Sequence, residues 1–506
     1  MAKENGFMFH SIVTTELPRT LFLAEQVRAM DRYAIEDLGI PGYVLMQRAG
    51  WAVFQVIQER WPDARKIAVL CGGGNNGGDG YVVARLALDA KFQVQVFSLS
   101  SPEGLKGDAL VACEAYRQAG GRVSEGVPSR LEDFDIVVDA LLGTGLDREV
   151  SGVYAQTIAM INGFNGGVVA VDIPSGLHAN SGVAMGKAVK ADATVTFIGL
   201  KQGLFTGDGP EVCGRIYYSD LAVPEEVLKY QVPAAYLQSR YINLLPPRPK
   251  TAHKGHFGHV LIIGGDTGFT GAVRMAAEAA ARVGAGLVSI ASRGAHAAHL
   301  NATRPELMCH GVETTTELQA LLGRATVVAI GPGLGQSGWA RSMLQPICDS
   351  GLPMVMDADA LNLLAQSPKF RENWIITPHP GEAARLLGCT SSEIQADRFA
   401  ALQALLEKFH GVCVLKGTGT LIGEKNQPCT ICTAGNPGMA SGGMGDILTG
   451  IIAGLIAQGL SLSDAARMGV SLHGTAGDKA AEAGERGMLA SDLLPWLRHL
   501  VNVEKA

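Results

Sequence analysis

One local pattern recurs along this chain: a short apolar run leads directly into a glycine-rich turn and then a helix. It is clearest at 66–71 (K-I-A-V-L-C), 134–140 (F-D-I-V-V-D-A), 259–263 (H-V-L-I-I) and 325–330 (A-T-V-V-A-I). Strands that alternate with helices in this way form a largely parallel sheet with helices on both faces. The 64 glycines and the small aromatic share suit many tight strand-to-helix turns. The sequence therefore predicts an α/β protein.

The length predicts two domains. A chain of 506 residues exceeds the size at which a single core keeps growing. The segment 245–250 (L-P-P-R-P-K) contains three prolines and is typical of a stiff connector. A new strand–helix series begins after it. We therefore expect one domain over 1–235 and a second over 236–506, with the proline-rich segment as the connector.

Charge, hydropathy and cysteine content exclude several classes of function. The net charge is -6 and no basic run occurs, so we expect no nucleic-acid partner. No apolar run approaches the length that spans a bilayer, so we expect no membrane partner. The nine cysteines form no framework, and the N-terminus lacks a leader pattern, which predicts a cytoplasmic protein. Cys429 and Cys432 lack a second ligand pair, so we interpret them as strand residues.

The first half begins with two predicted amphipathic helices, over 20–38 and 43–60, separated by G-I-P-G. The strand 66–71 then enters a predicted loop over 72–80 (G-G-G-N-N-G-G-D-G). Its G-x-G-x-x-G spacing indicates a phosphate-binding turn. The next strand, however, ends without the acidic residue that holds a ribose in dinucleotide folds. A merely tight turn remains the alternative.

Polar side chains follow several predicted strands of this half. Asp139 ends one strand, Asp172 ends another, and Ser175 follows closely; Asn76 lies in the glycine-rich loop. Because the carboxyl ends of parallel strands line one crevice, we expect these side chains to converge. A set of oxygen ligands without His or Cys suits a hard cation rather than zinc.

Three ordered motifs, G-N-N-G-G-D-G, V-D-A-L-L-G-T-G and V-D-I-P-S-G, resemble the epimerase domain of the NAD(P)H-hydrate repair enzymes. The resemblance covers about 200 residues and implies a Rossmann-like three-layer sandwich. It implies interconversion of the R and S forms of hydrated NAD(P)H, with Asp172 as the acid–base candidate. It further implies a potassium ion held by Asn76, Asp139 and Ser175. The implied substrate-binding residues are Asn75, Asn76, Gly77, Gly78, Asp79, Gly143, Thr144, Gly145, Leu146, Asp147, Arg148, Glu149 and Asp172.

The second half is organised around 435–450 (G-N-P-G-M-A-S-G-G-M-G-D-I-L-T-G), a predicted flexible loop that feeds a buried helix. Free N–H groups and the helix dipole favour anions at such a start. Asp446 lies inside this turn, where a carboxylate near phosphate is repelled unless it acts as a base. A solvated helix-capping Asp is the alternative.

The ordered motifs G-P-G-L-G, D-A-D-A-L-N, T-P-H-P-G-E, L-K-G-T-G-T and G-x-G-D resemble the ribokinase-like superfamily, and more narrowly the ADP/ATP-dependent NAD(P)H-hydrate dehydratases, over about 260 residues. The resemblance implies dehydration of the S hydrate through phosphorylation and elimination, with Asp446 catalytic, ADP or ATP as donor and Mg²⁺ present. Glu382 is a candidate to hold the magnesium–phosphate group, with a surface Glu as the alternative. The implied substrate residues are Ala272, Gly335, His379 and Asp446, with a rigid turn as the alternative for His379. The implied nucleotide residues are Lys416, Gly417, Thr418, Gly419, Thr420, Gly442, Gly443 and Gly445.

Two rival functions stay open on the sequence. A plain small-molecule kinase shares G-x-G-D but leaves residues 66–200 unexplained. A non-catalytic nucleotide sensor leaves Asp446 unexplained. We expect small-molecule substrates (hydrated NADH or NADPH, with ADP or ATP) and a homo-oligomer. The sequence does not decide between ADP and ATP.

Overall fold

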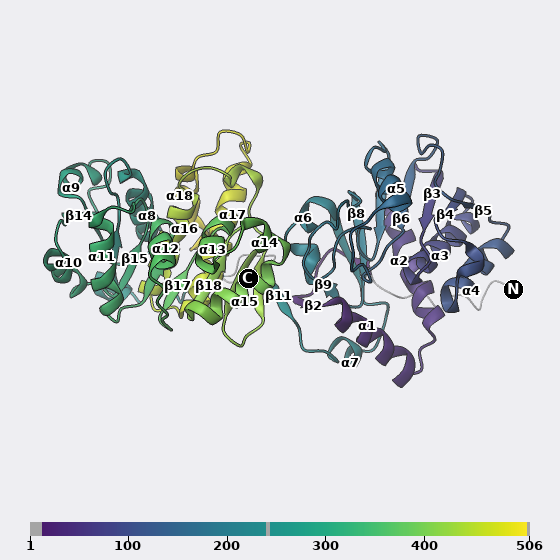
Figure 1. The fold of residues 1–506 in the computed structure, drawn as a ribbon, viewed down its shortest axis with the longest axis horizontal. Helices are drawn as coiled ribbons and strands as arrows, with labels where there is room; N and C mark the ends of the chain where they lie inside the picture. Colours follow the sequence, from purple (N-terminus) through teal and green to yellow (C-terminus); the bar gives the residue numbers. More distant parts are fainter. Residues whose placement is uncertain (1–12, 239–242, 503–506) are drawn as a thin grey trace. The chain divides into compact units, whose positions relative to one another are not determined.

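The computed structural model describes residues 13–238 and 243–502 and divides the chain into two compact units, Met1–Tyr236 and Leu237–Ala506 (Figure 1). The boundary falls beside the expected one at 235. The proline-rich segment lies within the second unit, where it forms neither helix nor strand. Arg248 Nη2, within the segment, donates to Gln458 Oε1 (2.9 Å), and Asn243 Nδ2, just before the segment, donates to the carbonyl of Val501 (2.9 Å). The segment is therefore attached to the second unit instead of being a free connector.

The first unit contains a sheet in the order β1-β10-β8-β7-β6-β3-β4-β5. Only β1 runs antiparallel to its neighbour among the described pairs. The strands are β1 (Val13–Thr14), β3 (Lys66–Cys71), β4 (Gln93–Ser98), β5 (Val123–Glu125), β6 (Ile136–Ala140), β7 (Gly167–Val171), β8 (Ala193–Phe197) and β10 (Arg215–Ser219). A smaller group pairs β2 (Thr20–Phe22) with β9 (Leu200–Lys201) and β11 (Ala235–Gln238).

Helices cover both faces of this sheet because its strand residues alternate between two cores. Ile67, Val69 and Cys71 of β3 belong to one hydrophobic cluster, and Ala68 and Leu70 to the other. The helices are α1 (Ala24–Arg32), which continues as a π-helical turn (Tyr33–Asp37), α2 (Gly42–Arg60), α3 (Asn75–Asp89), α4 (Gly107–Gln118), α5 (Gly152–Asn162), α6 (Gly209–Val212) and α7 (Glu225–Leu228).

Two sequence predictions in this unit were wrong in their bounds. The predicted helix over 20–38 begins only at Ala24, because Leu21 pairs in register with Leu200 and Ala235. The predicted loop over 72–80 ends at Gly74, where α3 begins. The polar residues 75, 76 and 79 therefore lie in the first turns of a helix, which fixes them more firmly than a loop would.

The second unit has the sheet order β14-β13-β12-β15-β16-β17-β18-β19-β20. It is parallel as far as β18 and ends in antiparallel pairs. The strands are β12 (His259–Ile263), β13 (Leu287–Ser292), β14 (Met308–Gly311), β15 (Val327–Ile330), β16 (Met354–Met356), β17 (Trp374–Ile376), β18 (Val412–Leu415), β19 (Thr420–Glu424) and β20 (Cys429–Cys432). The C-x-x-C motif is thus a buried strand, and both cysteines are free.

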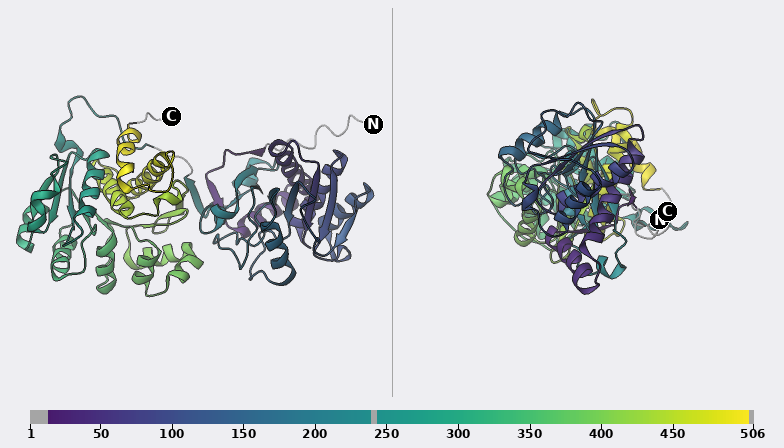
Figure 2. Two further views of the ribbon diagram at one scale, coloured as in Figure 1. Left: turned by 90° about the horizontal axis from the view of Figure 1, so that it is seen from above. Right: turned by 90° about the vertical axis from the view of Figure 1, so that its right-hand side faces the viewer.

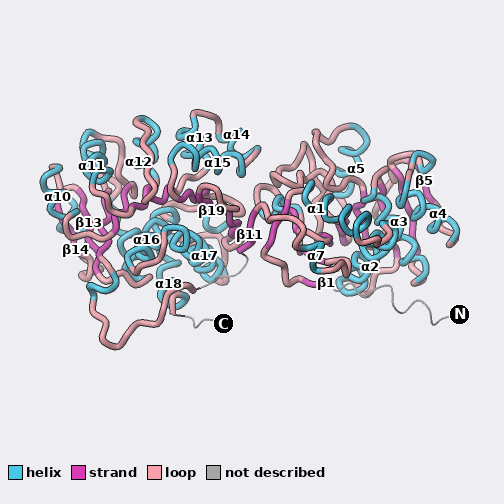
Figure 3. The backbone as a smooth tube through the Cα atoms, turned by 90° about the horizontal axis from the view of Figure 1, so that it is seen from below, coloured by secondary structure: helices cyan, strands magenta, loops and turns pink. Residues whose placement is uncertain are grey.

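Helices also cover both faces of the second sheet (Figure 3). One face carries α16 (Met444–Ala457), α17 (Leu462–Ala481) and α18 (Leu494–Leu500), which share a core with α8 (Thr270–Arg282). The other carries α10 (Thr315–Leu322), α11 (Gly338–Asp349), α12 (Ala358–Gln366), α13 (Pro380–Leu387), α14 (Ser391–Ala396) and α15 (Arg398–Phe409). The helix α9 is Gly294–Leu300. No helix in the described ranges is long and apolar enough to cross a membrane.

Helix α16 lies unusually close to α8. A Cβ atom at Gly450 would come within 2.0 Å of the carbonyl oxygen of Ala276, and one at Gly454 within 2.8 Å of that of Ala280. Glycine on one helix and alanine on the other permit this approach. The contact fixes the start of α16 against the sheet.

Candidate active sites

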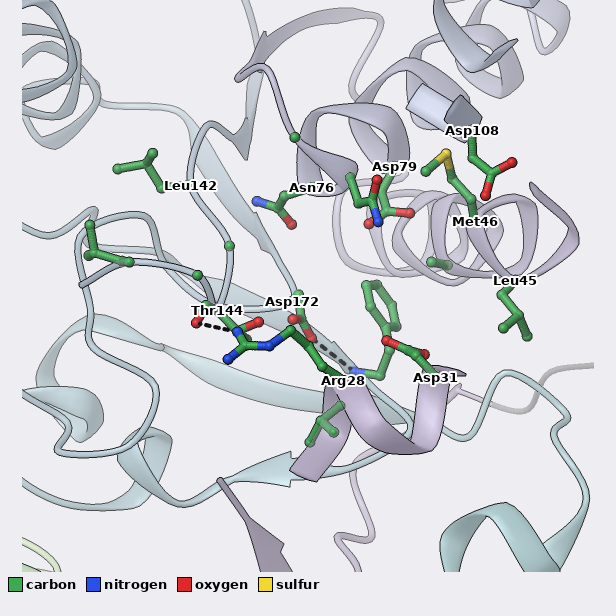
Figure 4. A pocket seen from close by; sticks show the side chains of 18 of the residues that line it. Arg28, Asp31, Leu45, Met46, Asn76, Asp79, Asp108, Leu142, Thr144 and Asp172 are labelled. Carbon is green, nitrogen blue, oxygen red and sulfur yellow. Dashed lines mark hydrogen bonds between the residues drawn. The ribbon is translucent and has the colours of Figure 1, made fainter. Parts of the chain in front are cut away.

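The first unit has a pocket of about 550 Å³ at the carboxyl ends of its strands (Figure 4). Figure 2 shows the chain from two further sides, with the first unit coloured purple to teal. Most residues singled out from the sequence line this pocket. They are Asn75, Asn76, Asp79, Gly143, Thr144, Gly145, Leu146, Asp147, Arg148 and Asp172.

Three of the predicted binding residues do not line it. Gly77 packs against the backbone, since a Cβ there would lie 2.2 Å from the carbonyl oxygen of Gly72. Gly78 packs on Met46, and the Glu149 side chain lies against Gly186. Gly77 and Gly78 thus have packing roles. The glycine-rich spacing in the sequence does not distinguish such roles from ligand binding.

Asp139 and Ser175 form one buried hydrogen-bonded group. Ser175 Oγ donates to Asp139 Oδ1 (2.6 Å), and the Ser175 N–H donates to Oδ2 (2.8 Å). Burial raises the pKa of Asp139 to about 6, and the hydrogen bonds from Ser175 oppose that rise. Asp139 forms no ion pair in the described ranges, so nothing there balances its charge.

Asn76 lies beside this group through the turn at Gly143. A Cβ at Gly143 would lie 3.2 Å from Asn76 Cβ, and the preceding N–H of Leu142 donates to Ser175 Oγ (2.8 Å). Asn76 Nδ2 is buried and has no hydrogen-bond partner among the described residues. An unbalanced buried carboxylate next to an unpartnered amide fits a cation site, although no group of three His, Cys, Asp or Glu side chains suited to a metal occurs in the described ranges.

Asp172 follows β7 with a backbone φ of 66°, a conformation that an L-residue adopts only under constraint. Its Oδ1 accepts hydrogen bonds from Thr196 Oγ1 (3.2 Å) and the Phe197 N–H (3.3 Å), and from Lys201 Nζ at short range. Lys201 is 1 % exposed. The sequence analysis did not single out Lys201; the only signal for it was a lysine inside the apolar run that follows β8.

The second unit brings the predicted nucleotide and substrate motifs to the carboxyl ends of β16, β17 and β18. Asp357, directly after β16, is 2 % exposed and accepts hydrogen bonds from Thr377 Oγ1 (2.8 Å), Lys416 Nζ (2.7 Å) and Thr449 Oγ1 (2.9 Å). Thr449 lies in α16, so this carboxylate connects the sheet edge to that helix. In the sequence, Asp357 stands out only as the first residue of the D-A-D-A-L-N motif.

Lys416 lies between two carboxylates, because Glu382 Oε2 approaches Lys416 Nζ at 3.7 Å. Burial lowers the pKa of Lys416, but Asp357 and Glu382 outweigh burial and raise it. Glu382 is 5 % exposed, so the alternative of a surface Glu is wrong. A cationic side chain of this kind can hold phosphate as a point charge.

Asp446 lies in the first turn of α16, after Gly443, whose φ is 92°. Burial raises the pKa of Asp446 to about 7; Asp357 adds to the rise, and Lys416 opposes it. A Cβ at Gly445 would lie 3.3 Å from Asp357 Oδ2 and 3.4 Å from Lys416 Nζ. The start of α16 therefore lies directly over this ion pair.

Arg398, a residue the sequence analysis missed, fixes the loop at 416–420. It is 1 % exposed, and its guanidinium donates to the carbonyls of Leu415 (3.2 Å) and Lys416 (3.3 Å). Thr420 Oγ1 closes the loop by donating to the carbonyl of Gly417 (2.9 Å). The backbone of the loop is thus fixed by Arg398 and Thr420, which keeps its polar groups in place for a ligand.

His379 is the N-cap of α13. Its Nδ1 accepts from the Gly381 N–H (3.0 Å), and its own N–H donates to Glu382 Oε2 (2.8 Å). The rigid-turn role of His379 is therefore present in the structure. Half of the ring stays exposed, so the same residue is accessible to a substrate.

Ala272 lies in the first turn of α8, which touches the loop after β15 that contains Gly335. A Cβ at Gly333 would lie 3.1 Å from Ala272 Cβ, and the N–H of Gly335 donates to Asp359 Oδ2 (2.9 Å). Gly442, by contrast, has open space where a side chain would be.

Each unit therefore presents glycine-rich turns, helix starts and buried carboxylates at the carboxyl edge of a parallel sheet, as nucleotide-handling α/β enzymes do. The chain belongs to the family of bifunctional NAD(P)H-hydrate repair enzymes. It is 51 % identical over 489 residues to the bifunctional NAD(P)H-hydrate repair enzyme Nnr of Coxiella burnetii, covering 95 % of this chain and 99 % of the relative. It is 46 % identical over 490 residues to the Nnr of Escherichia coli, covering 96 % and 95 %.

Two family models match separate parts of the chain. Residues 42–203 match the model described as YjeF-related protein N-terminus, and residues 260–498 match the one described as NAD(P)H-hydrate dehydratase. A crystal structure of ADP/ATP-dependent NAD(P)H-hydrate dehydratase from Bacillus subtilis, co-crystallised with ATP/Mg²⁺, is also similar. It is 27 % identical, with a TM-score of 0.45, and covers 51 % of this chain and 93 % of that one.

Proposed function

We propose that the first unit epimerises hydrated NADH and NADPH and that the second dehydrates the S form back to NAD(P)H with ADP or ATP as phosphoryl donor. The observation that carries the proposal is Asp446. It is a partly buried carboxyl group whose pKa is raised to about 7, at a helix start, over the Lys416–Asp357 pair. A base poised near neutral pH, beside donors for phosphate, suits phosphoryl transfer from a hydroxyl group.

In the dehydratase reaction, Asp446 takes the proton of the ring hydroxyl group, whose oxygen attacks the terminal phosphate of the nucleotide. The bond between that phosphate and the nucleotide breaks, and the shortened nucleotide leaves. The ring nitrogen lone pair then expels the phosphate, and loss of a proton from the adjacent ring carbon restores the dihydropyridine. Lys416 and the N–H groups at Gly443 and Gly445 stabilise the charge that develops on phosphate.

Magnesium, when bound, neutralises charge on the nucleotide phosphates. Glu382 is the side chain we assign to that ion, although it already accepts from the His379 N–H and lies near Lys416. Mg²⁺ commonly keeps few protein ligands and binds mainly through phosphates and water. The described residues are compatible with such binding.

In the epimerase reaction, Asp172 assists loss and return of the hydroxyl group at the hydrated ring carbon. A potassium ion, when bound at Asn76, Asp139 and Ser175, would balance the buried carboxylate and hold the turn at Gly143 against α3. Asn75, Asn76 and the 143–148 turn would bind the nucleotide. This assignment is supported by the unbalanced charge of Asp139 and the unpartnered Asn76 amide.

The test uses chemically hydrated NADH with the full chain, with and without ADP or ATP, and follows the return of reduced-nicotinamide absorbance. We expect return only with nucleotide, and consumption of both epimers. A stable phosphorylated product without return would instead identify a small-molecule kinase. Binding without any turnover would identify a sensor.

A further inference from the structure

Lys201 occupies a position that leaves Asp172 with one bound and one unbound oxygen. Lys201 Nζ donates to Asp172 Oδ1, to Thr196 Oγ1 (3.1 Å) and to the carbonyl of Phe197 (3.2 Å), so its three protons are all used. Asp172 Oδ1 accepts three hydrogen bonds, whereas Oδ2 accepts none within 13–238. Both residues line the pocket.

Two further carboxyl groups line this part of the pocket, but neither accepts a hydrogen bond from Lys201. Asp31 comes from α1 and Asp79 from α3, and neither accepts a hydrogen bond from any described residue. Figure 4 shows Asp31, Asp79 and Asp172 gathered around one end of the cavity. One ammonium group therefore faces three carboxyl groups and pairs directly with only one. The remaining ionisable or charged residues that line the pocket are Arg28, Asp108, Asp147, Arg148 and Tyr154.

We propose that Asp31 is a second catalytic residue of this pocket, the proton donor that works with Asp172, and that Lys201 is the positioning residue that holds Asp172 Oδ1 and leaves Oδ2 towards the substrate. The proposal rests on the proposed epimerase function of this unit.

The electrostatics of the two unpartnered carboxyl groups favour Asp31 over Asp79 as the donor. Burial raises the pKa of Asp31 to about 6; Lys201 opposes the rise and Asp172 adds to it. Burial, together with Asp172 and Asp31, raises the pKa of Asp79 well above its ordinary value. Asp31 can therefore exchange its proton near neutral pH, whereas burial and two neighbouring carboxyl groups favour the protonated form of Asp79. General acids work best when their pKa lies near the working pH.

The assignment gives a balanced reaction. The Asp31 proton moves to the hydroxyl oxygen of the substrate, the C–O bond breaks with its electrons on oxygen, and water leaves as the ring nitrogen forms a C=N bond. A water molecule adds to the other face of that carbon and gives a proton to Asp172. The pair has then exchanged protonation states, and solvent exchange resets it. No oxidant or second substrate is needed.

The test measures interconversion of separated R and S hydrates by the full-length protein without nucleotide, so that dehydration does not interfere. The pH–rate profile of the wild type should be bell-shaped. Asp31→Asn should lower the rate by about 10² to 10⁴. In this variant the rate should no longer fall on the alkaline side of the profile. Asp31→Glu, which keeps an acid in a shifted position, should retain more activity. Lys201→Met should lower the rate, because Asp172 loses the ammonium group that holds its Oδ1, and Lys201→Arg should recover part of that rate.

The matched control is Asp37→Asn, an exposed residue at the end of the same helical segment, which should leave the rate and the profile unchanged. Near-normal rate and an unchanged profile in Asp31→Asn would overturn this proposal while the epimerase function stands. Absence of epimerisation in the wild type would overturn the function itself. If Asp31→Asn does not fold, a wild-type profile in Asp31→Glu with no loss of rate would equally overturn the role.

Discussion

Replacing Asp446 with Asn should separate the chemistry of the second unit from its stability. The pKa of Asp446 is about 7, so about a tenth of the carboxyl groups are ionised at pH 6 and about nine-tenths at pH 8. Because the base must be ionised, dehydration by the wild type should rise about tenfold over this interval. Asp446→Asn should lower turnover by about 10² to 10⁴ and abolish this dependence.

The same substitution should stabilise the protein at alkaline pH. The folded-state pKa of Asp446 is raised above the ordinary value of 3.8, so its contribution to stability is present below about pH 4 and is lost as pH rises through about 7. A rise of about three pH units corresponds to at most about 4 kcal/mol at pH 8, and partial exposure reduces this figure. Asp446→Asn should therefore raise Tm at pH 8 and leave it unchanged at pH 3.

The measurements are turnover with hydrated NADH, ADP binding by calorimetry and thermal unfolding, all on one preparation. ADP affinity should hold or rise, since a repelling charge is gone. Asp464→Asn is the matched control: Asp464 also lies in the first turn of a helix, α17, but its side chain is 40 % exposed and paired with Arg467 (2.7 Å). Near-normal turnover in Asp446→Asn would remove this residue from the chemistry. Loss of folding would make it a structural cap.

Three further outcomes are expected. Asp357→Asn should shift the pH–rate midpoint of dehydration to lower pH, because Asp357 raises the pKa of Asp446; a midpoint that stays at about 7 would contradict the coupling. Gly450→Ala should lower the free energy of unfolding by about 1–3 kcal/mol or more through the clash with Ala276, whereas Gly338→Ala, with open space, should not. Expressed alone, 1–236 and 237–506 should each fold. The shorter fragment 250–506 should melt at a lower temperature than 237–506, because it lacks the contacts of Asn243 and Arg248. Equal melting temperatures would count against a stabilising role of these contacts.

The sequence by itself determined the strand–helix order and the motif positions. Apolar runs such as 66–71 and 412–415 are short and bounded by glycine, so they specify buried strands whatever the neighbouring elements are. Parallel pairing then places every strand's carboxyl end at one edge. For this reason the sequence predicts that Asn76, Asp139, Asp172 and Ser175 converge, and it places Asp446 at a helix start.

Only the tertiary structure decided the surroundings of these residues. Lys201, Asp31 and Arg398 carry no local pattern that distinguishes them from other charged residues. Their importance arises because β9, α1 and α15 bring them beside groups remote in sequence. The pKa of Asp446 likewise depends on Asp357 and Lys416, which lie 89 and 30 positions earlier in the chain. Burial and charge pairing depend on how the elements pack, so they can be determined only when the elements are placed in space.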